Sequence, residues 1–132
     1  KLLESKLGQA AVSRFFVPPA GEEVEITGTV DAVSTVPRPC AVPYRDHIMT
    51  VQLGNVTVSG KSQQAPVQAI VYFFSMRDNV WTSAARLRPG DHISVRVRDW
   101  SDVSSHYEQI NRSELDDPAL QLEEPLWGEL RP

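Results

Sequence analysis

The feature that most constrains this chain is the strict alternation of apolar and polar residues over 93–98, which read Ile-Ser-Val-Arg-Val-Arg. Successive side chains of a β-strand point to opposite faces, so a period of two gathers the three β-branched residues on one face. The segment therefore predicts a strand with one face in an apolar core, while the other face carries Arg96 and Arg98 outward.

Three more segments predict strands. Residues 24–30 alternate in the same way and are rich in β-branched residues. Residues 47–56 continue the pattern as far as Gly54-Asn55, which either bulges the strand or ends it. Residues 67–74 are apolar on both faces, as is typical of a central strand. We expect a short fifth strand at 107–110, after a polar turn.

The connections between these segments narrow the choice of fold. Three prolines within residues 37–43 predict a stiff loop between the first and second strands. Thr82 predicts the start of a brief helical turn over 83–87, between the third and fourth strands. We predict an all-β fold, a five-stranded OB-fold-like Greek-key barrel with one or two short helices. An SH3-like barrel and a small β-sandwich are the alternatives.

The 132 residues are enough for one globular domain, and a single Cys leaves no disulfide within the chain. We expect an N-terminal helix or arm at 1–20, a β-barrel domain at 21–115 and an acidic C-terminal tail at 116–132. The chain opens on Lys1 without a signal-peptide pattern, so we expect a processed or excised piece of unknown localisation. No apolar run approaches the roughly 18 residues of a membrane helix, and no membrane insertion is expected.

Charge is distributed in blocks along the chain. Residues 1–35 carry three basic and five acidic residues, residues 36–98 carry eight and three, and residues 99–132 carry two and nine. The net charge of −4 thus combines a basic centre with an acidic C-terminal part. Seven of the eight central cations are Arg, whose planar guanidinium pairs well with carboxylates and phosphates. Either the acidic part folds back onto these arginines, or they face an anionic ligand.

The sequence carries no catalytic signature. No Gly-x-Ser-x-Gly elbow accompanies the three histidines, and no Gly-rich phosphate loop occurs. Asp46-His47 and Asp91-His92 are adjacent pairs whose side chains point to opposite faces of a strand, which disfavours a metal site. We therefore predict a protein that is not an enzyme, with no catalytic residue, no metal ligand and no cofactor.

Binding is better supported than catalysis. An OB barrel holds its ligand across strands two and three, between the loop joining strands one and two and the loop joining strands four and five. Aromatic rings there stack on sugar rings or bases, and guanidinium groups pair with anions. The candidate ligand-binding residues are Tyr44, Arg45, Tyr72, Arg96, Arg98, Trp100 and Tyr107. Alternatively, the aromatic residues simply fill or seal the barrel.

Two stretches carry a family resemblance, Met76-Arg77-Asp78-Asn79 and Asn111-Arg112-Ser113-Glu114-Leu115. With them, residues 44–128 resemble the C-terminal segment of bacterial alginate O-acetyltransferase-like proteins, which carry an SGNH-hydrolase-type catalytic domain and act on exported polysaccharide. The Ser, Asp and His motifs of that catalytic domain are missing here. The resemblance implies an accessory domain in a periplasmic or extracytoplasmic setting. The partner that it implies is an acidic polysaccharide or an acyltransferase domain of the same parent protein.

The first functional hypothesis is therefore a non-catalytic β-barrel module that binds acidic polysaccharide or docks an acyltransferase domain. The alternative is an OB-fold single-stranded nucleic-acid-binding protein, which the same fold and residues allow. The net charge of −4 and the acidic C-terminal part count against nucleic acid, because nucleic-acid-binding domains usually carry net positive charge. A third possibility is a purely structural interaction domain.

Overall fold

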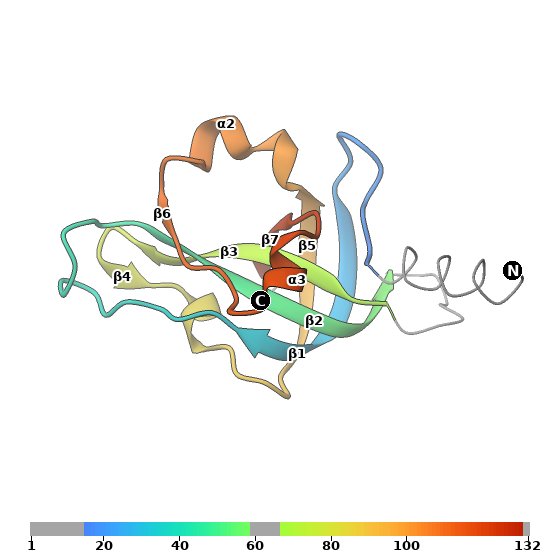
Figure 1. The fold of residues 1–132 in the computed structure, drawn as a ribbon, viewed down its shortest axis with the longest axis horizontal. Coiled ribbons are helices and arrows are strands. Elements are labelled where there is room, and N and C mark those ends of the chain that lie inside the picture. The colour runs from blue at the N-terminus through green and yellow to red at the C-terminus, as the bar shows by residue number, and fades with distance from the viewer. Residues whose placement is uncertain (1–14, 59–66, 131–132) are drawn as a thin grey trace, which may run out of the picture.

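A computed structural model of the chain describes residues 15–58 and 67–130. Residues 1–14 of the expected N-terminal arm lie outside the described residues. In chain order the elements are β1 (Val24–Val33), β2 (His47–Val58), β3 (Ala69–Arg77), β4 (Val80–Trp81), the 3-10 turn η1 (Ser83–Arg86), β5 (His92–Asp99), the 3-10 turn η2 (Trp100–Asp102), α2 (Ser104–Tyr107), β6 (Asn111–Arg112), α3 (Pro118–Gln121) and β7 (Leu126–Leu130) (Figure 1).

Five of these strands close into a barrel. β1 pairs antiparallel with both β2 and β5, and β2 pairs antiparallel with β3. β7 runs antiparallel to β5 and parallel to β3, which completes the circle. The two-residue strands β4 and β6 add to β3 and β2 respectively. The prediction of an all-β barrel with only short helices is confirmed.

The predicted fifth strand at 107–110 is wrong. These residues end α2 and form the turn after it, because Val103, Tyr107 and Ile110 fall at helical rather than strand spacing and pack on one side. The fifth strand of the barrel is β7, within residues 116–132 that we expected as an acidic tail. β7 runs parallel to β3, and the long connection that parallel strands need passes through β4, η1, β5 and the segment between β5 and β7.

The four other predicted strands are confirmed as β1, β2, β3 and β5. Gly54-Asn55 does not end β2, which continues to Val58. Asn55 has a left-handed φ of 50°, and the pairing of β2 with β1 shifts register beside it, as at a bulge. Thr82 stands at the start of η1 as predicted, but its hydroxyl donates to the Phe74 carbonyl instead of capping the turn.

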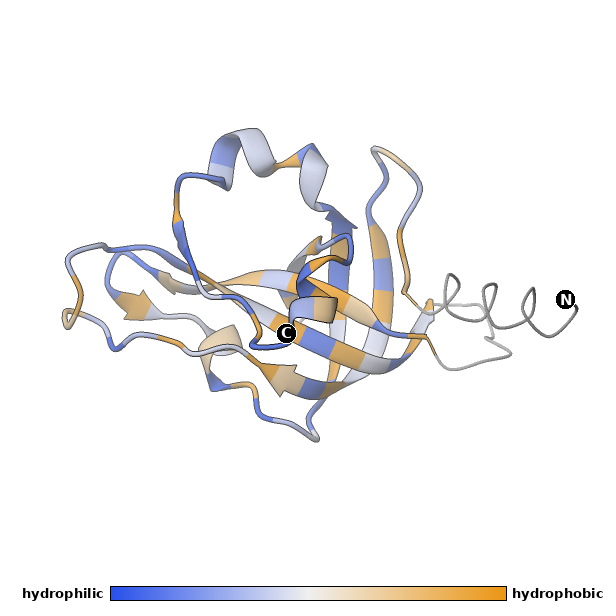
Figure 2. Cartoon of the chain, in the orientation of Figure 1, coloured by the Kyte–Doolittle hydropathy of each residue, from blue (hydrophilic) through white to orange (hydrophobic). Residues whose placement is uncertain are grey.

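The barrel interior is filled by the apolar positions of the alternating strands, which appear as bands of alternating colour along β1 and β2 in Figure 2. Its buried side chains include Ile26, Val30, Met49, Val51, Leu53, Val71, Phe73, Val95, Val97 and Leu126. Gly128 of β7 also faces this interior, where a Cβ atom on it would lie 2.5 Å from Val71 Cγ1 and 3.0 Å from Phe73 Cε1. β7 fits between β3 and β5 because this residue has no side chain.

One end of the barrel is closed by η1, both of whose alanines are buried. The chain reaches η1 from β3 through the two-residue turn Asp78-Asn79, whose left-handed φ values of 53° and 64° suit a tight hairpin. This hairpin brings β4 against the loop 34–46, which joins β1 to β2. There, Trp81 Nε1 donates a hydrogen bond to the Pro37 carbonyl at 2.8 Å.

Candidate functional site

Residues 100–114, which we call the cover segment, lie across the outer face of the barrel (Figure 1). They contain η2, α2 and β6, and β6 pairs parallel with the start of β2. Their apolar side chains pack with outward-facing side chains of β2, β3 and β7 and form an outer cluster, separate from the barrel interior. It consists of Ile48, Tyr72, Phe74, Trp100, Val103, Tyr107, Ile110 and Trp127. The outer face of β2 and β3, where we expected the ligand, is therefore covered by the protein's own chain.

Aromatic rings of the outer cluster meet edge to face. The ring centroids of Tyr72 and Trp100 lie 5.0 Å apart at an interplanar angle of 83°. Phe74 lies 4.9 Å from Trp127 and 5.1 Å from Tyr107, at angles of 89° and 79°. Ring quadrupoles favour such perpendicular contacts by about 0.5–1.5 kcal/mol each, beyond the apolar area that they bury. The rings therefore pack as one block between α2 and the barrel.

A charged group fastens the end of the cover segment to β3. The Glu114 carboxylate accepts from Arg112 Nε at 2.6 Å and from the Tyr72 hydroxyl at 3.0 Å. The guanidinium carbon of Arg112 lies 4.7 Å from the Tyr72 ring centroid and 5.5 Å from that of Trp100, a cation–π arrangement. Burial raises the pKa of Tyr72 to about 12, with an opposing effect of Arg112 and a further rise from Glu114, so the hydroxyl keeps its proton at neutral pH.

A buried hydrogen-bond chain joins β3, β2 and the end of β6. His47 Nδ1 lies 2.6 Å from Ser75 Oγ, and His47 Nε2 lies 2.9 Å from Ser113 Oγ. The Ser75 hydroxyl donates to the His47 carbonyl, so it accepts from Nδ1–H, and Nε2 accepts from the Ser113 hydroxyl. Burial lowers the pKa of His47, which favours this neutral ring. These hydrogen bonds connect β2 with β3 and with the residue that follows β6.

Three of the seven predicted ligand-binding residues come together. Tyr72, Trp100 and Tyr107 all lie in the outer cluster, and Tyr72 is only 6% exposed. Tyr44 stands apart from them in the loop between β1 and β2, where its ring stacks on that of His47 at a centroid distance of 6.1 Å. The rings of Tyr72, Trp100 and Tyr107 thus pack together on the outer face of the barrel.

The three predicted arginines have three different surroundings. Arg45 pairs with the exposed carboxylate of Asp78. Arg96 points outward from β5, with Nη1 3.7 Å from Glu23 Oε1. The Nε atom of Arg98 is buried and has no hydrogen-bond partner among the described residues. The structure does not gather these arginines around one ligand position.

A pocket of about 220 Å³, which we call the aromatic pocket, opens where β3 and β7 separate beside the outer cluster. Its aromatic walls are Phe74, Tyr107 and Trp127. Its polar groups come from Arg77, Ser83 and Glu129. The Arg77 guanidinium carbon lies 3.9 Å from the Phe74 ring centroid, which holds the cation at the rim. Such a pocket suits a small ligand that has an apolar ring face and several hydrogen-bonding groups.

Sequence reasoning found only Tyr107 among the residues of this pocket. Trp127 and Glu129 were missed because residues 116–132 were expected to form a tail. A signal was present, since 126–130 read Leu-Trp-Gly-Glu-Leu and alternate with a period of two. That pattern places Trp127 and Glu129 on one face of a strand and the buried Leu126 and Gly128 on the other.

Within residues 15–58 and 67–130, no group of three or more His, Cys, Asp or Glu side chains is arranged to hold a metal ion. In the same part of the chain, the helices are all too short to cross a bilayer. A comparison of the sequence and the fold with protein-family models, curated proteins and solved structures finds no match. A proposal for function therefore has to come from the geometry of the pockets and surfaces.

Proposed function

We propose that this chain is a non-catalytic binding module for acidic polysaccharide and that the aromatic pocket holds one of the sugar rings. The observation that carries the proposal is the convergence of Phe74, Tyr107 and Trp127 on a pocket that also bears Arg77 and Glu129. A sugar ring has an apolar face that stacks on aromatic rings, and its hydroxyls bond to charged or polar groups at the rim.

The strand order supports an OB-type barrel in preference to an SH3-like one. The third barrel strand, β3, pairs in parallel with the last, β7, and the short turn η1 lies between the third and fourth barrel strands. OB-type Greek-key barrels bind oligosaccharides and oligonucleotides, with the loops between strands one and two and between strands four and five beside the ligand. Here the second of these loops contributes Tyr107 to the aromatic pocket.

The position of the cover segment supports a sugar as the ligand rather than a single-stranded nucleic acid. OB-type binders of nucleic acid track the backbone along a positively charged groove and stack successive bases on exposed aromatic rings. In this chain the outer face of β2 and β3 lies beneath the cover segment, and Tyr72 on that face is only 6% exposed. The aromatic pocket has room for one ring rather than a run of stacked bases.

The family resemblance supplies the setting of the proposal. As an accessory domain of an extracytoplasmic polysaccharide O-acetyltransferase-like protein, the module would hold the polymer near a separate catalytic domain. If the module docks a catalytic domain instead of binding sugar, the apolar side chains of Val80 and Leu122, which are 64% and 87% exposed, are available for contact with that domain.

The test is a calorimetric and NMR titration of the chain with uronic-acid oligomers. We expect chemical-shift changes at Phe74, Tyr107 and Trp127, and a loss of affinity of at least about fivefold in Tyr107→Ala, because a stacked ring contributes about 1–3 kcal/mol. Leu122→Ala, which removes an exposed apolar side chain outside the pocket, is the matched control and leaves the affinity unchanged.

Oligo-dT separates the two candidate ligands in the same experiment. Tighter binding of oligo-dT than of the oligouronate, with a log-log salt slope of about −0.7 per phosphate contact, would replace the sugar proposal by the nucleic-acid alternative. Binding of neither probe, together with capture of an acyltransferase domain, would leave a docking domain. Circular dichroism of Tyr107→Ala checks that the loss of affinity does not come from unfolding.

A further inference from the structure

On the basis of the proposed function, we infer that a second pocket recognises the charge of the polysaccharide by binding its uronate carboxylates. This pocket, of about 310 Å³, lies on the other side of η1 from the aromatic pocket, and we call it the basic pocket. The side chains that carry the inference are those of Arg38, Trp81, Arg86 and Arg88. None of them was singled out from the sequence as a ligand-binding residue.

The three arginines of the basic pocket have guanidinium N–H groups that can meet an anion, although Arg88 Nη1 also donates to the Leu87 carbonyl at 2.9 Å. All three are exposed, and all three lie on its wall. No ion pair within the described residues involves them, whereas Arg45, Arg77, Arg96 and Arg112 each pair with a carboxylate. The lining of the pocket contains no Asp or Glu. Unpaired guanidinium groups around a cavity are the arrangement that binds carboxylate or phosphate in the forked, bidentate manner.

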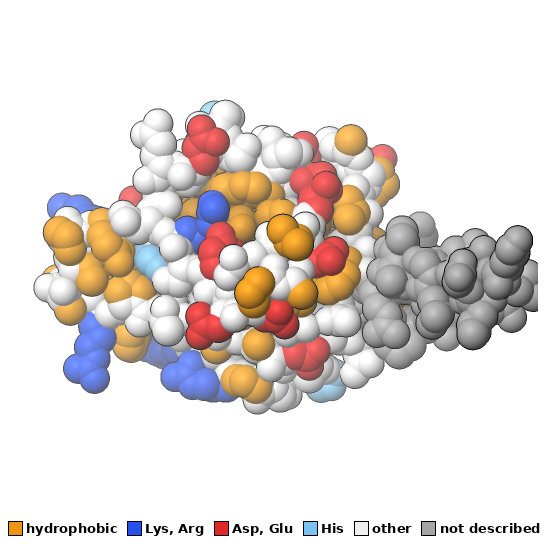
Figure 3. Space-filling model, viewed as in Figure 1, with side chains coloured by type: hydrophobic (Ala, Val, Ile, Leu, Met, Phe, Trp, Pro, Cys, Tyr) orange, Lys and Arg blue, Asp and Glu red, His pale blue; other side chains and the backbone are white. Residues whose placement is uncertain are grey.

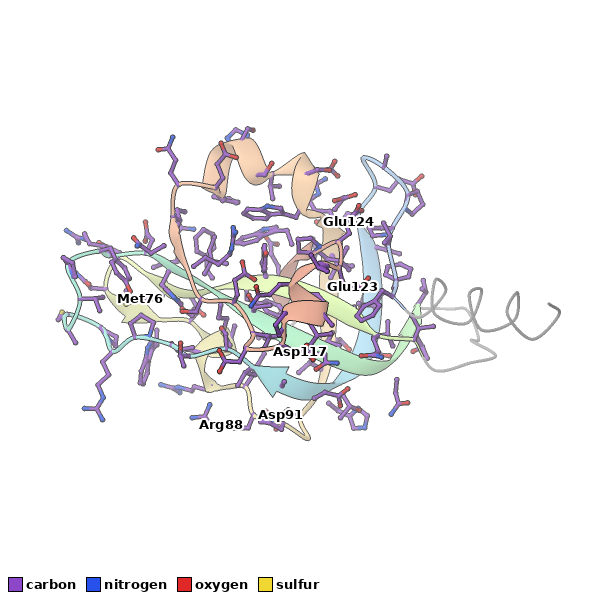
Figure 4. The ribbon with its side chains drawn as sticks, viewed as in Figure 1. Met76, Arg88, Asp91, Asp117, Glu123 and Glu124 are labelled. Carbon is purple, nitrogen blue, oxygen red and sulfur yellow. The ribbon has the colours of Figure 1, made fainter. Side chains whose placement is uncertain are left out.

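One carboxylate near these arginines, that of Asp91, bonds to the backbone of Arg88 and forms no ion pair with its guanidinium group. The Asp91 carboxylate accepts from the backbone N–H of Arg88 at 2.9 Å and so closes the turn before β5. Figure 4 shows Arg88 and Asp91 at one edge of the molecule, away from Glu123 and Glu124, which lie near α3. In Figure 3, Arg and Lys side chains lie mostly at the left and lower left of the molecule, and Asp and Glu side chains lie across its centre and top. Within the part of the chain that the structure describes, no Asp or Glu of the acidic C-terminal part forms an ion pair with the three arginines of the basic pocket.

Trp81 gives the basic pocket a fixed aromatic wall. Its Nε1 donates to the Pro37 carbonyl at 2.8 Å, which holds the indole between β4 and the loop 34–46, and its side chain remains 40% exposed. A ring held in this way stacks on a sugar with little further loss of side-chain freedom on binding. The pocket therefore offers a platform for a sugar ring and guanidinium groups for the carboxylate that the ring carries.

η1 connects the two pockets. Ser83 and Ala84 line the aromatic pocket, and Ala85 and Arg86 line the basic pocket. These are consecutive residues of a single 3-10 turn. The same turn thus contributes to the aromatic pocket, which stacks on a sugar ring, and to the basic pocket, which binds a carboxylate. We assign the preference for acidic over neutral polysaccharide to the basic pocket.

The experiment titrates the chain with a uronic-acid oligomer and with a neutral oligomer of equal length, following the indole N–H resonance of Trp81, assigned by Trp81→Phe. We expect this resonance to shift with the uronate only. The double variant Arg86→Gln/Arg88→Gln should lose at least about tenfold in affinity for the uronate. Arg86→Lys/Arg88→Lys keeps both charges but cannot form the forked pair, so it should lose clearly less affinity than the Gln variant while still binding more weakly than the unchanged chain.

Equal losses in the two double variants, or no loss in either, would overturn the inference, because neither result depends on charge. Sodium galacturonate and inorganic phosphate, as single-unit probes, separate it from the proposed function. If galacturonate shifts the Trp81 resonance while Tyr107→Ala changes no affinity, the basic pocket stands and the aromatic site fails. If the oligomer binds through Tyr107 and Trp81 does not respond, the basic pocket fails. A larger response to phosphate than to galacturonate would overturn the assignment to uronates.

Discussion

The two apolar clusters of this protein are held in different ways. The barrel interior is largely aliphatic and is enclosed by strands that pair with neighbours on both sides. The outer cluster is largely aromatic, and the cover segment that encloses it is fastened by the two-residue strand β6 and by side-chain bonds of His47, Tyr72 and Glu114. The interior is therefore held by apolar packing and backbone pairing, whereas the outer cluster also depends on hydrogen bonds of polar side chains.

The difference is sharpest at two consecutive phenylalanines of β3. Phe73 belongs to the interior and is 2% exposed, whereas Phe74 points the other way and is only partly buried in the outer cluster. We expect Phe73→Ala to lower the free energy of unfolding by about 3–5 kcal/mol, because it leaves a cavity that strands cannot close. Phe74→Ala should cost less, on the order of 1–2 kcal/mol, because the cover segment can settle onto the vacated space.

Urea unfolding of the two variants, followed by circular dichroism, measures both losses. Amide hydrogen exchange then locates them: Phe74→Ala should raise exchange mainly within residues 100–114, and Phe73→Ala throughout the barrel. Equal losses spread over the same amides would mean that the two clusters form a single cooperative unit.

Substitution of Gly128 tests the packing of the interior by adding volume instead of removing it. A methyl group there would meet Val71, Phe73 and Val95 from distances of 2.5–3.0 Å, and all three are fixed in the core. We expect Gly128→Ala to destabilise the barrel by about 1–3 kcal/mol through overpacking. Gly54→Ala is the control, because the three atoms nearest to its added methyl all belong to the exposed Asp31 carboxylate, which can turn away. Thermal unfolding compares the two, and an equal effect would argue against a tightly filled interior.

The interior could be predicted from the sequence because strand alternation encodes it directly. Residues such as Val95 and Val97 share one face of a strand whatever the rest of the chain does. The same pattern at 126–130 was overlooked, since it is short and lies among acidic residues. Its pairing with β3 and β5 joins residues that are distant in the sequence. This pairing depends on which strand edges are open in the barrel and not on local propensity.

The outer cluster and the basic pocket could not be predicted in this way. Tyr72, Trp100 and Tyr107 were correctly grouped, but the sequence does not say that the segment carrying two of them folds back over the third. Which arginines remain unpaired depends on contacts between distant elements, such as Arg96 with Glu23. The charges counted along the chain indicated a basic centre but not where its unpaired arginines lie. Three of them, Arg38, Arg86 and Arg88, line the basic pocket beside η1.

The smallest effect that we predict concerns the polar fastening of the cover segment. His47 is buried and neutral, and burial lowers its pKa in the folded protein. Above the unfolded-state pKa of about 6.5, neither state holds the proton, so His47 adds no pH dependence. Below that pH the unfolded chain takes up a proton that the folded chain refuses. Stability therefore falls as the pH drops toward the folded-state pKa, with a slope of at most about 1.4 kcal/mol per pH unit.

Chemical unfolding between pH 7.5 and pH 5 measures this slope. His47→Gln should be less stable at pH 7.5, because it breaks the hydrogen bonds to Ser75 and Ser113, but it should lose less on acidification than the unchanged chain. His92→Gln, which removes an exposed imidazole, should keep the full slope. If all three proteins lose the same stability on acidification, His47 does not contribute to the pH dependence. The two clusters would then differ in packing and not in their response to pH.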